Sequence, residues 1–130
     1  MLAFRYDSPT SAVSNIPRSE LLVLQEIFES TNGADWIWQP EYAGSHWQFA
    51  DPDVNPCLQQ WQGIECLPLG VIATNHITGL DLDAYNLTGT IPNSISNLTY
   101  LQILSATNNT IFGTLPAALG ALTHLHVLDL

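Results

Sequence analysis

Apolar residues recur along the C-terminal part of this sequence at a fixed interval of 24 residues. Leu80 is followed after this interval by Leu104 and then, after the same interval again, by Leu128. The same interval relates further pairs: Leu87 with Ile111, Gly89 with Gly113, Ile91 with Leu115, Pro92 with Pro116, Leu98 with Leu122, and Leu101 with Leu125. A fixed period of about 20–50 residues is typical of a repeat architecture. The pattern predicts a solenoid of stacked units.

Each unit reads as a short strand, a bend and a return. The leucines of an L-x-L triplet point to one face of a strand, and the residue between them points to the other. Asn109 follows the second strand, where its side-chain amide can bond backbone groups that have no strand partner. A glycine and a proline then break any regular strand, and residues 94–98 and 118–122 are long enough for about one helical turn. One unit cannot bury its own apolar face, whereas stacked neighbours can.

Residues 101–116 fit the pattern L-x-x-L-x-L-x-x-N-x-L-x-G-x-I-P closely, and residues 80–92 fit its later part with Tyr85 in the asparagine slot. This pattern resembles the plant-type leucine-rich repeat. The resemblance covers two full units and a truncated third, residues 77–130. It implies a right-handed α/β solenoid, with parallel strands on its concave face.

Residues 17–30 are the clearest helix in the chain. Leu21, Leu24, Ile27 and Phe28 form one apolar stripe, and the glutamates of this segment are expected on its other faces. Pro17 and Gly33 suit the start of a helix and the position after its end. We expect the helix to cover the apolar end of the first repeat; the alternative is an amphipathic helix that binds a partner.

Between this helix and the repeats lies an aromatic-rich segment with two cysteines. Its aromatic residues are Trp36, Trp38, Tyr42, Trp47, Phe49 and Trp61, and its cysteines are Cys57 and Cys66. The order of helix, T-N-G-x-x-W, C…W-x-G-I-x-C and repeats resembles the N-terminal cap of plant-type leucine-rich repeat proteins, including receptor-like proteins and kinases, and of related protist surface proteins. The resemblance implies a cap over residues 17–76, linked by a disulfide between Cys57 and Cys66. Free thiols or half of a zinc site are the alternatives.

Charge limits the partners that this chain can bind. The net charge is −10, with two arginines and twelve acidic residues among 130. Nucleic acids and anionic membrane surfaces are therefore excluded as expected partners. No run of about 18 apolar residues suggests a membrane span. Residues 1–16 lack the features of a signal peptide, so we expect a disordered or mispredicted N-terminus, and a chain that continues in both directions.

Two groups of side chains have a spacing that could suit a metal ion. Asp51, Asp53 and Asn55 have the spacing that opens a calcium loop, but Pro56 and Gln62 occupy the slots of the glycine and the closing glutamate. His124 and His126 lie two apart on a strand, in slots that the repeat gives to surface residues. We interpret the first as a turn and the second as surface, and we expect no metal and no cofactor.

Catalytic motifs are missing from the sequence, which has no G-x-S-x-G, phosphate-binding loop or H-E-x-x-H. Asp81 and Asp83 form a pair of carboxylates at a spacing near that of an inverting glycosidase. We interpret the pair instead as variable residues on a concave surface, and we expect no enzyme activity. A kinase domain in a longer parent protein would lie outside this chain.

Three Asn-x-Thr triplets begin at Asn86, Asn97 and Asn108 and are candidates for N-glycosylation. Asn97 lies in the return segment, away from the strand face, and is the best placed of the three. Together with the cysteine pair, the triplets favour an extracellular or cell-surface location.

The expected ligand surface lies between the inward leucines. Stacking aligns Asp81, Ser105 and Asp129 in one column and Asp83 and Thr107 in the next. An acidic and hydroxylated surface suits a basic or hydrogen-bonding peptide, a protein or a glycan. The sequence predicts a non-catalytic recognition module. The alternatives are an adhesion spacer of a cell-wall or matrix protein and a secreted inhibitor of wall-degrading enzymes.

Overall fold

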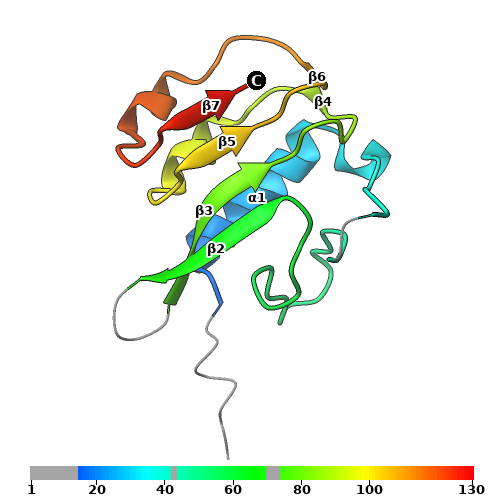
Figure 1. Cartoon of the computed structure of the whole chain (residues 1–130), viewed down its shortest axis with the longest axis vertical. Helices are drawn as coiled ribbons and strands as arrows, with labels where there is room; N and C mark the ends of the chain where they lie inside the picture. The colour runs from blue at the N-terminus through cyan, green and yellow to red at the C-terminus, as the bar shows by residue number, and fades with distance from the viewer. Residues whose placement is uncertain (1–14, 42–43, 70–73) are drawn as a thin grey trace, which may run out of the picture.

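The structure, a computed structural model, describes residues 15–41, 44–69 and 74–130 (Figure 1). The elements in chain order are α1 (Arg18–Ser30), η2 (Gly33–Asp35), β2 (Ile64–Leu69), β3 (Thr74–Asp81), β4 (Thr88–Gly89), η3 (Asn93–Asn97), β5 (Ile103–Ser105), β6 (Thr110–Ile111), η4 (Ala117–Ala121) and β7 (Val127–Asp129). Residues 1–14, most of the expected disordered segment, and Tyr42 lie outside the described residues. Ile16 is buried and joins the core.

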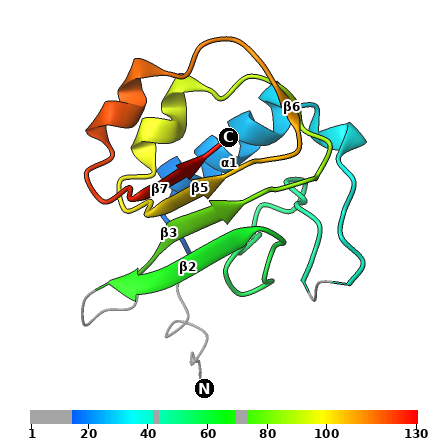
Figure 2. The same cartoon turned by 45° about the horizontal axis from the view of Figure 1, so that its top comes forward.

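The 24-residue period sets the register of the main sheet. Its strand order is β2-β3-β5-β7. Strands β3, β5 and β7 are parallel, and Leu80 pairs with Leu104, which pairs with Leu128 (Figure 2). A second, two-stranded parallel sheet joins β4 to β6, with Gly89 opposite Ile111. Residues one period apart therefore lie side by side in the main sheet, whereas the partners in the second sheet, such as Thr88 and Thr110, are offset from that period.

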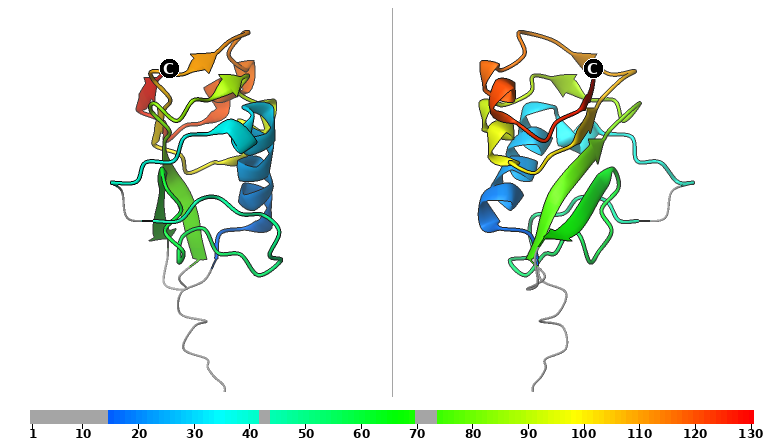
Figure 3. Two further views of the ribbon diagram at one scale, coloured as in Figure 1. Left: turned by 90° about the vertical axis from the view of Figure 1, so that its right-hand side faces the viewer. Right: turned by 60° about the vertical axis from the view of Figure 1, so that its left-hand side comes forward.

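The helices line the side of the molecule opposite the main sheet. Figure 3 shows α1, η3 and η4 on one side and β2, β3, β5 and β7 on the other. Helix α1 contacts η3, and η3 contacts η4. The apolar residues between these layers form the core, and its members from residues 77–130 are Ile77, Leu80, Leu82, Tyr85, Leu87, Ile91, Ile95, Leu98, Leu101, Leu104, Ala106 and Leu122. Helices α1, η3 and η4 therefore lie side by side in one row, in that order.

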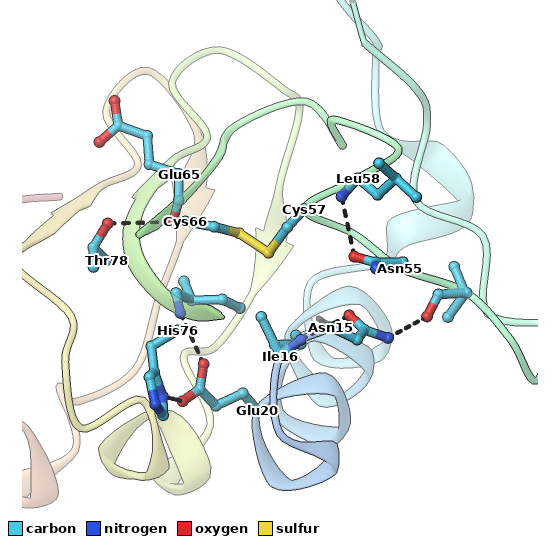
Figure 4. The surroundings of a disulfide bond; sticks show 12 residues. Asn15, Ile16, Glu20, Asn55, Cys57, Leu58, Glu65, Cys66, His76 and Thr78 are labelled. Atoms are coloured by element: carbon cyan, nitrogen blue, oxygen red, sulfur yellow. Dashed lines mark hydrogen bonds and ion pairs between the residues drawn. A yellow bond between two sulfur atoms is a disulfide. The ribbon is translucent and has the colours of Figure 1, made fainter. Parts of the chain in front are cut away.

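Helix α1 packs on the expected apolar stripe, which the structure widens by two further residues. Leu24 and Ile27 are buried, Leu21 and Phe28 are half-buried against the core, and Val23 is buried in addition. Glu20, expected on a solvent face, is also buried. Its carboxylate accepts the N–H of Ile77 at 2.8 Å and lies 2.7 Å from Nδ1 of His76 (Figure 4). The inward turn of Glu20 satisfies a buried backbone donor of β3, which explains why a glutamate lies on the buried side of the helix.

Strands β2 and β3 form an antiparallel hairpin that the repeat pattern does not predict. Cys66 lies on β2, and its disulfide to Cys57 confirms the pairing that the resemblance implied, with an S–S distance of 2.08 Å (Figure 4). Strand β3 begins at Thr74 and so crosses the expected boundary between residues 76 and 77. The N-terminal segment and the first repeat therefore share one sheet.

Residues 51–55 form the turn that the sequence favoured over a calcium loop. The N–H of Asp53 donates to Oδ1 of Asp51 at 2.9 Å, and the N–H of Val54 donates to the Asp51 carbonyl at 3.2 Å. Both bonds are local, as in an Asx-turn. The Asp51 carboxylate is therefore used within the turn itself.

An aromatic cluster joins the N-terminal segment to the first repeat. The rings of Trp36 and Trp47, both buried, are 4.9 Å apart. Tyr85 packs 6.3 Å from Trp36, and its hydroxyl donates to Oε1 of Gln62 at 3.1 Å. Tyr85 replaces asparagine in the repeat because its ring fills the space between the first repeat and this cluster.

The chain after α1 runs alongside the first repeat and bonds to it. The N–H groups of Thr88 and Thr90 donate to the carbonyls of Thr31 and Ser30, at 3.2 and 3.3 Å. Between them lies Gly89, at φ 144°, where a Cβ atom would overlap the Ser30 carbonyl oxygen. A glycine is required here for both reasons. The end of α1 is thereby fixed against β4.

Candidate functional site

The first predicted column of site residues lies in one row across the sheet. Asp81 on β3 pairs with Ser105 on β5, which pairs with Asp129 on β7. Their neighbours Leu80 and Leu104 are buried, so the alternation of a strand turns this row to the face opposite the helices. Asp81 and Asp129 are exposed, and Ser105 is half-buried. The structure brings the three residues together as expected.

The second column is bonded to the first through Asp83. Oδ1 of Asp83 accepts the Ser105 hydroxyl and the Thr107 N–H, both at 2.7 Å. Partial burial alone would raise the pKa of Asp83, but these hydrogen bonds outweigh it and hold the pKa below its usual value. Asp83 therefore links one repeat to the next, a role that its slot in the repeat pattern does not reveal.

Asp81 has the opposite electrostatic character. Although the residue is exposed, neighbouring atoms partly remove water from its carboxylate, and this desolvation raises its pKa above the usual value. The negative charges of Asp83 and Glu65 act in the same direction, against a hydrogen bond from the Asp83 N–H at 3.4 Å. An added cation beside Asp81 would remove this unfavourable crowding of negative charge. Asp81 is thus the carboxylate of the pair that is better suited to a positively charged group.

A hollow of about 300 Å³ lies at the start of the first column. It is lined by Gly63, Ile64, Glu65, Asp81, Asp83 and Tyr85. Glu65 comes from β2, whose register against β3 shifts between Glu65 and Cys66. The sequence carries no signal for Glu65 as a site residue because neither the hairpin nor its irregular register follows the 24-residue period.

This surface offers oxygen atoms rather than nucleophiles or metal-ligand sets. Carboxylates and hydroxyls can bind ammonium, guanidinium or hydroxyl groups. Within residues 15–41, 44–69 and 74–130, no three His, Cys, Asp or Glu side chains gather in a way that suits a metal ion. The candidate site is thus an acidic, hydroxylated surface whose chemistry is compatible with cationic or hydrogen-bonding groups.

The pKa of Asp83 predicts an acid-dependent loss of stability. A carboxyl group whose pKa is lower in the folded chain stabilises the fold above its unfolded pKa, and this contribution is lost as the pH falls through the folded value. We expect Asp83→Asn to remove part of the fall in stability below about pH 4. The measurement is chemical denaturation from neutral pH downward, with Asp53→Asn as an exposed control. A wild-type fall that Asp83→Asn leaves unchanged would contradict this role.

The two histidines considered as a metal pair lie on the surface. His124 and His126 are both exposed. The ring of His124 is 5.5 Å from that of Tyr100, which in turn is 4.3 Å from that of His76. The three rings share the 24-residue interval and form a ladder along the stack, a feature that the period alone could have indicated.

The three glycosylation triplets lie in different surroundings. The side-chain amide of Asn86 donates to the Asp35 carbonyl at 3.0 Å. Asn108 is exposed at φ 58°, in a turn. Asn97 is exposed at the end of η3, on the side of the molecule opposite the sheet. Asn97 is thus the one of the three that is exposed on the side of the molecule opposite the strand face, close to α1.

Known proteins with similar sequences are plant receptor kinases. The nodulation receptor kinase of Pisum sativum is 45% identical over 56 residues, which is 42% of this chain and 6% of that protein. A probable leucine-rich repeat receptor-like serine/threonine-protein kinase, IRK, of Arabidopsis thaliana is 36% identical over 72 residues, which is 55% of this chain and 7% of that protein. No protein-family model matches the chain. The chain therefore spans a small fraction of the relatives that it resembles.

Among solved structures, the leucine-rich repeat ectodomain of the receptor kinase SOBIR1 from Arabidopsis thaliana is similar to this chain. The TM-score is 0.65 and the identity 26%, over 90% of this chain and 55% of that one. These similarities confirm the resemblance to plant-type leucine-rich repeat proteins and show a leucine-rich repeat fold. The similar structure is an ectodomain. No helix among the described residues is long and apolar enough to cross a membrane.

Proposed function

We propose that this chain is a non-catalytic recognition module, the N-terminal part of an extracellular leucine-rich repeat ectodomain that binds a peptide, protein or glycan. The observation that carries the proposal is the row of Asp81, Ser105 and Asp129, aligned in register on the three parallel strands of the main sheet. With a net charge of −10 on the chain, this row favours ligands that carry positive charge. A basic peptide is the ligand class that it fits best.

The architecture supports binding along the stack. In this proposal, residues 77–130 begin a right-handed solenoid, and the main sheet forms its concave face. Residues 17–76, which contain α1 and the Cys57–Cys66 disulfide, form its N-terminal cap. Solenoids bind extended partners along such a face, because successive repeats present equivalent positions at regular steps. The disulfide and the similarity to a receptor-kinase ectodomain support a location outside the cell.

The role of Asp83 decides which residues test the proposal. Because Asp83 holds Ser105 and Thr107, its substitution would disturb the stack as well as the surface. Asp81 and Asp129 are exposed, and the Asp81 carboxylate accepts the N–H of Asp83, a contact within its own repeat. The double variant Asp81→Asn and Asp129→Asn therefore changes the charge of the surface with the least change to its support.

The experiment is a selection of random displayed peptides on the wild-type chain and on this double variant. We expect peptides rich in arginine and lysine to be enriched on the wild type and to bind the double variant at least about tenfold less tightly, the effect of two lost charge-assisted contacts. The control is Asp51→Asn with Asp53→Asn, which removes the same charge from the exposed turn. Equal binding to all three proteins, or no enrichment, would contradict the proposal, and the second result would favour an adhesion spacer.

A further inference from the structure

A groove of about 200 Å³ separates α1 from η3 on the side of the molecule opposite the sheet. It is lined by Ser19, Leu22, Val23, Glu26, Ser94 and Asn97. Leu22 is 49% exposed, whereas the other large apolar side chains of α1 are buried or half-buried. The hydroxyl of Ser94 donates to Oε1 of Glu26 and bridges the two walls. The groove thus has one apolar wall and a polar wall rich in oxygen atoms.

These features match one face of an amino sugar. A pyranose ring with an N-acetyl group presents C–H groups and a methyl group that bury apolar surface, and hydroxyls that donate to carboxylates. Leu22 offers the apolar contact, and Glu26 and Ser94 offer acceptors. Lysine is missing from the sequence and Arg18 does not line the groove, so a neutral, hydroxyl-rich occupant fits better than an anionic one.

The groove contains its own attachment point for such a sugar. Asn97 on its wall begins the triplet Asn97-Leu98-Thr99, in which Asn97 and Thr99 are exposed and Leu98 is buried. No side-chain hydrogen bond holds the Asn97 amide within the part of the chain that the structure describes. The Asn86 amide, in contrast, is bonded to Asp35. Asn97 is therefore exposed, unbonded and beside a hollow of suitable size.

We propose that Asn97 is an N-glycosylation site whose first N-acetylglucosamine lies in the α1–η3 groove and covers Leu22. The glycan fixes η3 to α1 and covers this side of the molecule. The acidic face of the sheet lies on the opposite side and stays uncovered. The inference rests on the extracellular location proposed above, but it does not depend on which ligand the sheet binds.

The test uses the full chain secreted from eukaryotic cells. Enzymatic glycan release in heavy-oxygen water, followed by mass spectrometry, identifies the modified asparagines. A second sample is trimmed by an endoglycosidase to a single N-acetylglucosamine at each site. It is compared with Thr99→Ala, trimmed in the same way, which keeps Asn97 and every other sugar but loses the triplet. We expect Asn97 to be occupied and trimmed Thr99→Ala to melt about 3 °C below the trimmed wild type.

Leu22→Ser makes the thermal comparison specific to the groove. In this background the difference between the trimmed protein and its Thr99→Ala variant is expected to disappear, because the apolar contact is gone. An unmodified Asn97 would overturn the proposal, and so would equal melting temperatures of the trimmed wild type and Thr99→Ala. Neither result involves a peptide ligand, so the failure of this proposal is distinct from a failure of peptide binding.

Discussion

Gly89→Ala is expected to lower the free energy of unfolding by about 3–5 kcal/mol, the sum of a strained backbone and an overpacked contact. The added Cβ would overlap the Ser30 carbonyl oxygen, which belongs to the backbone and cannot rotate away. Relief would require α1 to move from β4, with loss of the hydrogen bonds from Thr88 and Thr90. The measurement is urea denaturation followed by tryptophan fluorescence.

The chain supplies its own control for this prediction. Gly113 lies one period later at φ 82°, and a Cβ there would meet only the Thr90 methyl group, at 3.2 Å. We expect Gly113→Ala to cost about 1–2 kcal/mol, the strain of the left-handed conformation alone. Equal effects of the two substitutions would show that the contact between α1 and β4 contributes nothing of its own.

Asn109→Ala is expected to destabilise the chain by about 2–4 kcal/mol, because it leaves several backbone groups without partners. Oδ1 of Asn109 accepts the N–H groups of Tyr85 and Leu87, at 3.1 and 2.9 Å. Its Nδ2 donates to the carbonyls of Leu82, Ala106 and Thr107. One side chain thus supports the bends of two successive repeats, and thermal and urea denaturation would both register its loss.

The adjacent asparagine is the matched control. Asn108 is exposed and adopts φ 58°, a conformation that glycine accepts without strain. We expect Asn108→Gly to change stability by less than about 0.5 kcal/mol. If Asn109→Ala were as mild as Asn108→Gly, the hydrogen bonds of Asn109 would not be what holds the two bends together.

The parts of the fold that follow the 24-residue period could be predicted from the sequence. The interval between Leu80 and Leu104 is also the register of β3 against β5, so the period by itself aligns Asp81 with Ser105. The bend asparagine, the glycine of β4 and the short return helices follow in the same way. Periodicity works here because stacking turns a sequence interval into a spatial contact.

Contacts between the N-terminal segment and the repeats could not be predicted in this way. Glu20 is buried because it meets the N–H of Ile77, 57 residues later, and a helical pattern contains no information about such a partner. The β2–β3 hairpin is antiparallel and irregular at Glu65, so no repeat interval indicates it. Tyr85 departs from the repeat pattern because it packs on the aromatic cluster rather than on another repeat.

The period predicts the positions of the site residues but not the division of roles among them. Asp81 and Asp83 look equivalent in the sequence, yet one is exposed beside other acids and the other is bonded to Ser105 and Thr107. The difference arises because the chain bends after Asp81, where β3 ends, and this brings Asp83 over the next repeat. The three-dimensional arrangement of the bend therefore separates a surface carboxylate from a linking one.

Recognition along the acidic face of the sheet is the central claim of this account. Its most direct test is a nuclear magnetic resonance titration of the isotope-labelled chain with a peptide enriched by the selection described above. We expect the largest shifts at the backbone amides of Asp81, Ser105 and Asp129, with little change in α1 or η3. Shifts confined to α1, η3 or the turn at residues 51–55 would contradict the claim and place binding elsewhere on the molecule.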